Sequence, residues 1–273
     1  MQVKIRYAKT EDLSQLKDIW LRCFNDSKEF IDLFFSYKGY WKAIVIEHNN
    51  TIVSMLFVIP TADDFWYIYA VATLPQYRKQ GLMKKLLNET YLRSIKHRKK
   101  GILLVPATEM IKKYYEKLGF VSFSKLKKVI LIPRSQQFDI IENKITESQI
   151  NTIRKKYFKE SIKWKSKHVA LSKLTTLVFG GDIIAFKYKK DQGYVVVENQ
   201  KHLIVKEIAF SSNVITMEVL QEITNFLCKR FSKTNEVIFH LIENSPIEGE
   251  LISFAMIKSN DLVSSKYFNL ALD

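Results

Sequence analysis

Residues 71–83, with the sequence VATLPQYRKQGLM, have the types and order needed to bind a pyrophosphate. A strand-like run ends at Thr73, and a loop with Arg78 and Lys79 leads directly into a helical pattern. The free N–H groups at a helix start carry partial positive charge, and Gly81 lets the backbone approach a ligand closely. The segment predicts a phosphate cradle; an ordinary strand–loop–helix joint is the structural alternative. The predicted binding residues are Val71, Ala72, Thr73, Arg78, Lys79, Gln80, Gly81, Leu82, Met83 and Lys84.

Other motifs for phosphate, nucleophile or metal chemistry do not occur in the sequence. There is no Gly-x-x-x-x-Gly-Lys-Ser/Thr loop, no Gly-x-Gly-x-x-Gly fingerprint and no serine elbow. No two histidines stand at the spacing of metal ligands. We therefore expect neither a P-loop, nor a dinucleotide fold, nor a metal. The scattered histidines are His48, His97, His168, His202 and His240.

The cradle needs a strand before it and a helix after it, and the first half of the chain supplies both. Thr10 is expected to cap a first helix, and Gly119 to end the last one. The predicted order is β-α-α-β-β-β-α-β-α-β, which indicates a mixed α/β fold of the α+β type. The predicted strands cover 3–7, 41–47, 51–59, 65–73, 102–105 and 120–132, and the helices cover 13–23, 29–37, 82–96 and 109–118.

The second half of the chain repeats this pattern. Residues 134–145 are expected as a linker between domains at 1–133 and 146–273. Ala209 follows Ala72 by 137 residues, whereas Met217 follows Met83 by 134, so the second copy has a shorter loop before its helix. The predicted strands cover 182–189, 194–198, 202–210 and 236–242, with a turn at 191–193, a helix over 217–231 and a strand-like ending over 267–273.

Arg78-x-x-Gly81-x-Met83 after a strand resembles the acyl-CoA signature of the GNAT superfamily of N-acetyltransferases. Met83 departs from the family's Gly or Ala. The run YYEKLGF over residues 114–120 resembles a second motif, the end of the family's fourth helix. The resemblance covers residues 1–132 directly and implies tandem GNAT-like folds, each a mostly antiparallel twisted sheet flanked by helices. The second fold would be a degenerate copy that shapes the acceptor cleft.

The resemblance implies an N-acetyltransferase that uses acetyl-CoA as cosubstrate, without a metal. A primary amine of a small molecule or peptide would attack the thioester directly. Backbone groups near Val71 and Thr73 would hold the acyl group and pantetheine arm, and an N–H near Val71 would stabilise the oxyanion. Tyr115 falls on the tyrosine of the family motif and is the predicted catalytic acid, with Tyr114 as a packing ring.

The base that accepts the amine proton is left open by the sequence. Asp63 and Asp64 precede the strand that ends at Thr73, and Asp26 and Glu29 lie near the region that borders the acceptor in the family. The tandem arrangement also resembles the enhanced-intracellular-survival acetyltransferases, which implies the carboxylate of Asp273 as a further candidate. Each of the four internal carboxylates has a plain surface role as its alternative.

Charge and composition limit the partners. The 273 residues include 43 Lys and Arg against 28 Asp and Glu, a formal charge of +15. These charges are dispersed, which favours solvated faces over a nucleic-acid footprint, although an RNA acceptor stays open. No apolar run reaches the length of a membrane span. Cys23 and Cys228 form no disulfide framework, so reduced thiols in a cytoplasmic protein are expected.

Two further functions stay open beside acetyl transfer. A GNAT fold without catalysis would sense acyl-CoA or bind a partner. A Fem-type aminoacyltransferase would also have tandem GNAT folds, but the acyl-CoA loop at Arg78–Gly81 favours a CoA thioester. The oligomeric state is not indicated.

Overall fold

The computed structural model describes residues 2–135, 137–144, 146–212, 214–232, 235–261, 263–264 and 266–269. The first half follows the predicted order of strands and helices. Its elements are β1 (Lys4–Tyr7), α1 (Leu13–Cys23), α2 (Lys28–Ser36), β2 (Lys42–His48), β3 (Thr51–Pro60), β4 (Phe65–Thr73), α3 (Leu82–Lys96), β5 (Gly101–Leu104), α4 (Glu109–Glu116) and β6 (Val121–Leu131).

The second half repeats the order of the first, apart from one helix. Its elements are β7 (Ile141–Asn143), α5 (Glu147–Tyr157), α6 (Ser166–Val178), β8 (Asp182–Tyr188), β9 (Asp191–Asn199), β10 (Leu203–Phe210), α7 (Met217–Phe231), β11 (Val237–Ile242) and β12 (Glu250–Ser259). Residues 243–249, all of which are described, contain no counterpart of α4. The chain is therefore a tandem of two GNAT-like folds, the second one reduced.

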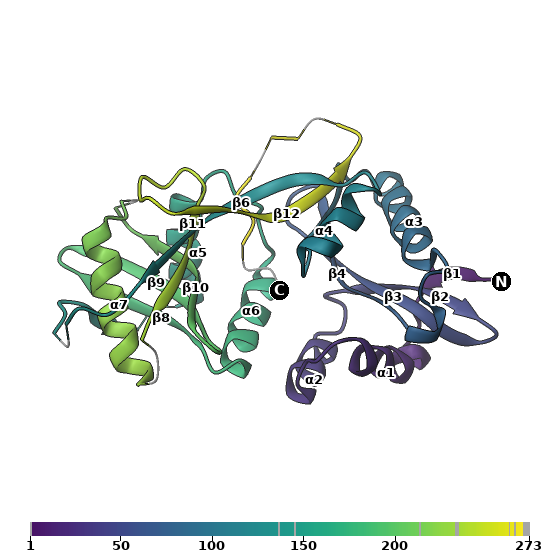
Figure 1. The fold of residues 1–273 in the computed structure, drawn as a ribbon, viewed down its shortest axis with the longest axis horizontal. Helices are drawn as coiled ribbons and strands as arrows, with labels where there is room; N and C mark the ends of the chain where they lie inside the picture. Colours follow the sequence, from purple (N-terminus) through teal and green to yellow (C-terminus); the bar gives the residue numbers. More distant parts are fainter. Residues whose placement is uncertain are drawn as a thin grey trace.

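The two halves exchange a strand. Over the described residues the sheet runs β1-β2-β3-β4-β5-β12-β6-β11-β10-β9-β8-β7. The order is symmetric about the central β12–β6 pair, because each strand of one half has its counterpart in the other half at the same distance from the opposite edge of the sheet. β12 pairs with β5 through Met256 and Leu104, while β6 pairs with β11 through Leu131 and Val237. These two strands also pair with each other and bridge the halves in Figure 1. Residues expected as the second domain thus contribute a strand to the sheet of the first half.

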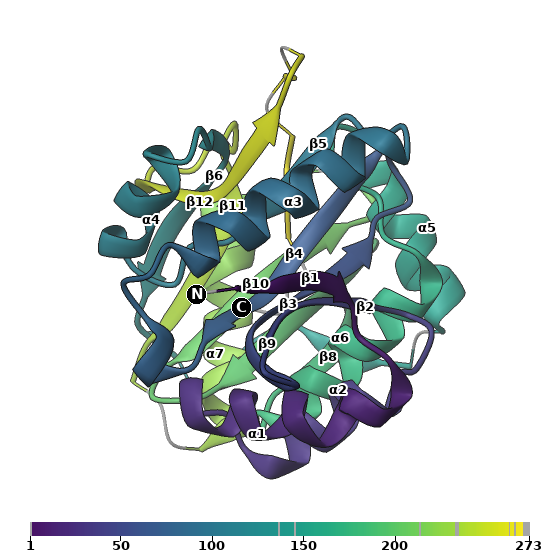
Figure 2. The same cartoon turned by 90° about the vertical axis from the view of Figure 1, so that its right-hand side faces the viewer.

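Helices cover both faces of each half. In the first half, α3 and α4 lie on one face of the sheet and α1 and α2 on the other (Figure 2). Successive side chains of a strand point into the two different layers. Ile44 and Leu56 pack with α3, whereas Val45 and Phe57 pack with α1 and α2. The layer under α1 and α2 continues into α5 and α6, so one apolar core joins the halves. The core depends on both halves being present.

Two local predictions need correction. Thr10 does not cap α1, because residues Thr10–Asp12 form a short 3-10 turn in which the Asp12 carboxylate accepts from the Lys9 N–H at 2.6 Å. The turn predicted at 191–193 lies at 189–190 instead, and residues 191–193 belong to β9. Gly193 is needed for close packing, since a Cβ there would meet Phe186 at 2.9 Å.

The segment expected as a linker contains β7, which pairs with β8. Of the strand-like ending expected over 267–273, residues 267–269 are described, with a single bridge from Tyr267 to Ser161. Asp273 lies outside the described residues. The two cysteines are half-buried and free.

Candidate active site

A β-bulge in β4 opens the sheet at the predicted cradle. Met55 of β3 lies opposite Ala72, but Phe57 lies opposite Tyr69, so β4 carries one extra residue between them. Ala70 takes up the extra residue with a left-handed φ of 47°. A bulge leaves backbone groups out of the ladder and increases the local twist. The backbone around Ala70 is therefore turned toward the space beside the sheet.

β4 and β5 diverge from one another on this side. Their parallel register covers Phe65–Tyr67 and residues 101–103, at the beginning of both strands. Beyond it, Ile68 and Leu104 border a cavity rather than each other. The sequence thus builds a cleft between two parallel strands, next to the bulge.

The wider part of this cleft, the outer cavity, has a volume of about 800 Å³. Nine of the ten predicted binding residues line it. Gln80 is the exception, since its side-chain amide donates a hydrogen bond to the Gln76 carbonyl. The sequence did not indicate the other wall, formed by Cys23 and Phe24 at the end of α1. The lining residues are Cys23, Phe24, Val71, Ala72, Thr73, Tyr77, Arg78, Lys79, Gly81, Leu82, Met83, Lys84, Ile111, Tyr114, Lys117 and Leu118.

The start of α3 presents free N–H groups to the outer cavity. Gly81 is the N-cap residue, and no side chain caps the helix. Gly81 and Lys79 both have left-handed backbone, with φ of 72° and 62°. A Cβ on Gly81 would meet no atom within 4 Å, so the space beside Gly81 is open. Arg78 braces the loop, because its Nε donates to the Thr73 carbonyl at 3.0 Å.

The narrower part, the inner cavity, has a volume of about 410 Å³ and lies beside the bulge. Phe24, Val71, Met83 and Ile111 line both cavities, so the two are adjacent. The residues lining the inner cavity are Trp20, Phe24, Asp26, Tyr67, Ile68, Tyr69, Ala70, Val71, Met83, Leu104, Val105, Ala107, Ile111 and Tyr115.

Tyr115 of α4 faces the inner cavity and is 5% exposed. Burial, with a smaller contribution from Tyr114, raises the pKa of Tyr115 to about 12. The phenol therefore stays protonated at neutral pH, as a proton donor must. Thr108 caps α4 by accepting from the Ile111 N–H, which fixes the start of the helix that carries Tyr115.

The predicted carboxylates are not equivalent in the structure. Asp26 lines the inner cavity, and its Oδ2 accepts from Trp20 Nε1 at 2.7 Å. Asp63 and Asp64 precede β4, at the opposite end of that strand from the bulge; Asp63 accepts from the Lys163 N–H instead. Glu29 is exposed on α2 and lines neither cavity. Asp26 is thus the one described candidate that borders the cleft.

The second half supports the wall of the inner cavity. Tyr67 packs against Trp164 at 5.6 Å and against Phe268 at 5.4 Å between ring centroids. From β12, Lys258 Nζ donates to the Leu118 carbonyl at 2.8 Å and to Asn88 at 3.0 Å. This lysine ties the end of the α4 segment to α3. Both halves therefore position the groups around one cleft.

The corresponding place in the second half is built differently. β10 has its own bulge at Lys206, but the side-chain amide of Asn269 donates to the Lys206 carbonyl there. Thr216 caps α7 by accepting from the Val219 N–H. With α7 capped, the bulge occupied and no helix like α4, the second half lacks the features that make the first cleft.

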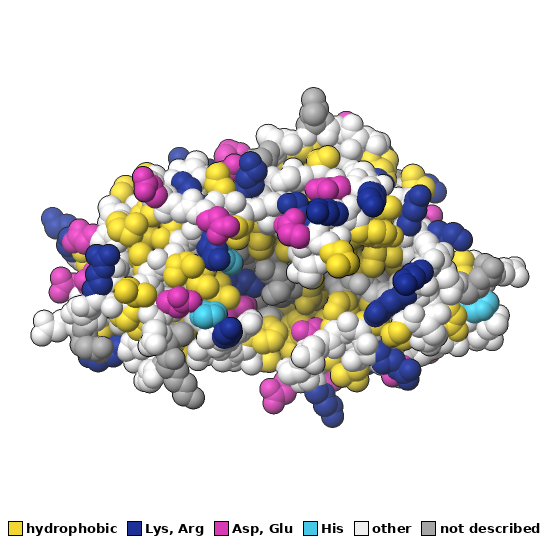
Figure 3. All heavy atoms as spheres, viewed as in Figure 1, with side chains coloured by type: hydrophobic (Ala, Val, Ile, Leu, Met, Phe, Trp, Pro, Cys, Tyr) yellow, Lys and Arg dark blue, Asp and Glu magenta, His cyan; other side chains and the backbone are white. Residues whose placement is uncertain are grey.

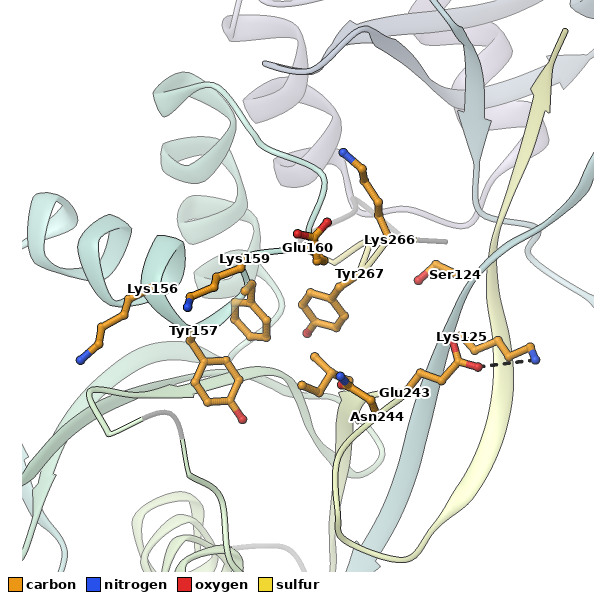
Figure 4. A pocket seen from close by; sticks show the side chains of 12 residues that line it. Ser124, Lys125, Lys156, Tyr157, Lys159, Glu160, Glu243, Asn244, Lys266 and Tyr267 are labelled. Carbon is orange, nitrogen blue, oxygen red and sulfur yellow. Dashed lines mark ion pairs between the residues drawn. The ribbon is translucent and has the colours of Figure 1, made fainter. Parts of the chain in front are cut away.

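A cavity of about 470 Å³ remains on this side of the second half (Figure 4). Tyr157 and Phe158 at the end of α5 line it, as Cys23 and Phe24 at the end of α1 line the first cleft. Tyr267 enters it and stacks on Phe158 at 4.4 Å between centroids. The cavity carries acids and bases together, including the pair of Lys125 and Glu243 at 3.6 Å, unlike the purely cationic outer cavity.

Comparison with known proteins agrees with this geometry. Residues 39–122 match the family model described as acetyltransferase (GNAT) domain. This range contains β4, the cradle, α3 and α4. No curated protein sequence matches the chain.

Several solved structures share the fold across both halves. A probable N-acyltransferase of Enterococcus faecalis V583 superposes with a TM-score of 0.70 at 12% identity, over 95% of this chain and 73% of that one. A GCN5-related N-acetyltransferase of Anabaena variabilis gives 0.66 at 15% identity, over 94% and 73%. Eis1 of Mycobacterium abscessus gives 0.65 at 9% identity, over 94% and 73%. At these identities the likeness establishes the fold.

Membrane-spanning helices and metal-binding clusters are both absent from the described residues. None of their helices has the length and apolar character to cross a membrane. No group of three His, Cys, Asp or Glu side chains within the described ranges is arranged to hold a metal ion.

Proposed function

Because residues 39–122 carry a GNAT acetyltransferase domain, we propose that this chain is an N-acetyltransferase that moves the acetyl group of acetyl-CoA to a primary amine. The observation that supports this most is the adjacency of the two cavities at the β4 bulge. A cationic outer cavity borders an inner one that is lined by a buried, protonated tyrosine.

The outer cavity fits the charged end of acetyl-CoA. Arg78, Lys79, Lys84 and Lys117 line it without any carboxylate among the lining residues. The uncapped start of α3 adds N–H donors for the pyrophosphate. The pantetheine arm would follow the cleft between β4 and β5 toward the bulge. There the backbone of residues 70–72 would hold the acyl carbonyl and stabilise its developing negative charge.

The chemistry needs two proton transfers from groups of this chain. The ammonium group of the acceptor first loses one proton to solvent water, and the amine nitrogen then forms a bond to the acetyl carbonyl carbon. The second proton of this nitrogen passes to Asp26, directly or through water. The C–S bond then breaks, and the departing thiolate takes the proton of the Tyr115 hydroxyl. Solvent returns a proton to Tyr115 and takes the proton from Asp26. The products are the acetylated amine and CoA.

A non-catalytic acyl-CoA-binding module is the alternative. Met83 favours it, since this side chain lines both cavities at a position where the GNAT signature has a small residue. One assay separates the two functions: incubation of the protein with acetyl-CoA and a panel of amines, with CoA release followed by a thiol reagent and acetylated amine by mass spectrometry. Release of CoA with matching acetylamine supports the enzyme. Tight CoA binding without turnover on any amine supports the module.

A further inference from the structure

The two adjacent cavities carry opposite kinds of charge. Arg78, Lys79, Lys84 and Lys117 line the outer cavity. Among the described residues, the inner cavity has a single charged lining residue, the carboxylate Asp26. A ligand that spans both would therefore be anionic at one end and cationic at the other. Since the anionic end matches CoA, the cationic end belongs to the acceptor.

Asp26 is held in place for a ligand. Its Oδ2 accepts from Trp20 Nε1 at 2.7 Å, and Trp20 is fully buried among aromatic rings. The carboxylate is half-buried, and its second oxygen, Oδ1, has no partner recorded in the described part of the chain. An ammonium group would satisfy that oxygen through a charge-assisted hydrogen bond.

The rest of the inner cavity is apolar and aromatic. Trp20, Phe24, Tyr67 and Tyr69 surround Asp26, and rings of this kind attract both apolar bodies and cations. Figure 3 shows the molecule hollowed between its halves, with apolar side chains along the border of the hollow. Within the described part of the chain, no lining residue of the inner cavity is a Lys or Arg that would receive a carboxylate or phosphate of the acceptor.

We infer that the acceptor is a small primary amine on an apolar or aromatic body without a carboxylate or phosphate, and that Asp26 determines this specificity by binding its ammonium group. This inference rests on the proposed acetyl transfer. A free amino acid is disfavoured, because its carboxylate would enter a cavity whose one charge is negative.

Matched amines test the substrate class. We would compare phenethylamine with phenylalanine, and hexylamine with 6-aminohexanoate, each pair differing by one carboxylate. Two readouts are needed: kcat/KM for acetylation, and calorimetric binding of the amine to the protein saturated with CoA. We expect kcat/KM at least about tenfold higher for the uncarboxylated member of each pair, the effect of one charged interaction.

Asp26→Asn tests the residue. Asparagine keeps an oxygen that accepts from Trp20 and removes the charge, so amine binding and kcat/KM should fall by about 10- to 100-fold while CoA affinity is unchanged. Asp18→Asn is the matched control, since Asp18 is an exposed residue of α1, the helix that precedes Asp26, and is paired with Arg22 at 2.9 Å. It should change neither value.

The outcomes separate this inference from the proposed function. Equal turnover of the carboxylated amines, or unchanged amine binding in Asp26→Asn, would overturn the inference while acetyl transfer stands. Turnover confined to amines of peptides would also overturn it. Amine binding that depends on Asp26, without acetylation of any amine, would support the inference and remove the proposed transfer.

Discussion

Asp26 and Tyr115 line the same cavity beside the β4 bulge, although 89 positions separate them in the sequence. One lies between α1 and α2, and the other on α4, so the sheet brings together the proposed proton acceptor and the proposed proton donor. In the proposed reaction the amine would lie on the Asp26 side of the cleft and the thiolate on the Tyr115 side.

Tyr115→Phe should reduce turnover by about 10²–10⁴-fold with little change in acetyl-CoA binding, because it removes the proton donor and keeps the ring. Steady-state kinetics and calorimetry measure the two effects. Tyr114→Phe is the control: its side chain lines the outer cavity, and we expect less than about a threefold change in turnover. Parallel loss of binding and turnover in Tyr115→Phe would indicate a structural role.

The pH profile should contain no loss of activity from Tyr115 in the neutral range. Tyr115 must be protonated to donate. Its protonated form is lost as the pH rises through the pKa of Tyr115, which burial raises to about 12. We therefore expect kcat to show no alkaline limb from this group below about pH 11. A limb near pH 9 that vanishes in Tyr115→Phe would show that the phenol ionises far more easily than its burial implies.

Gly81→Glu should weaken CoA binding by more than about 100-fold, because it adds a negative charge beside the phosphates. Gly39→Glu is a matched control: Gly39 also has a left-handed φ, 78° against 72° for Gly81, and open space at its Cβ. Both variants take on about 1–2 kcal/mol of backbone strain. If Gly39→Glu loses CoA binding equally, the effect comes from strain and not from the cradle.

Residues 1–133 expressed alone should not fold to a stable monomer. In the whole chain β5 pairs with β12 and β6 pairs with β11, so the fragment leaves both ladders without a partner. Circular dichroism and thermal unfolding would detect this, and co-expression with residues 134–273 should restore a single cooperative transition. A well-folded fragment with the transition temperature of the full chain would contradict the importance of the exchange.

The sequence predicted the elements around the cradle well and their long-range pairing poorly. The bounds of β4 and α3 match the prediction to the residue. Each element has a strong hydrophobic periodicity, β4 ends at Thr73, and Gly81 marks the start of α3. β12 was not predicted, since a local pattern cannot tell that residues 250–259 belong beside β5. α5 was not predicted either; its last turn contains Arg154, Lys155 and Lys156.

The site shows the same division. The predicted cradle residues lie close together in the sequence, and nine of these ten line the outer cavity. Cys23, Phe24 and Asp26 come from α1 and the segment after it, and their approach to the bulge is a tertiary fact. For this reason the sequence could not choose Asp26 over Asp63, whose carboxylate holds the Lys163 backbone instead.

The most direct test is the calorimetric titration of the full chain with acetyl-CoA. We predict one binding event per chain, because α3 has an open, uncapped start in a cationic cavity whereas α7 is capped by Thr216. Arg78→Ala should weaken that event by about tenfold or more, and Lys159→Ala in the second-half cavity should leave it unchanged. Two equivalent events, or one event that is insensitive to Arg78 and lost in Lys159→Ala, would contradict the assignment of the cofactor to the first half.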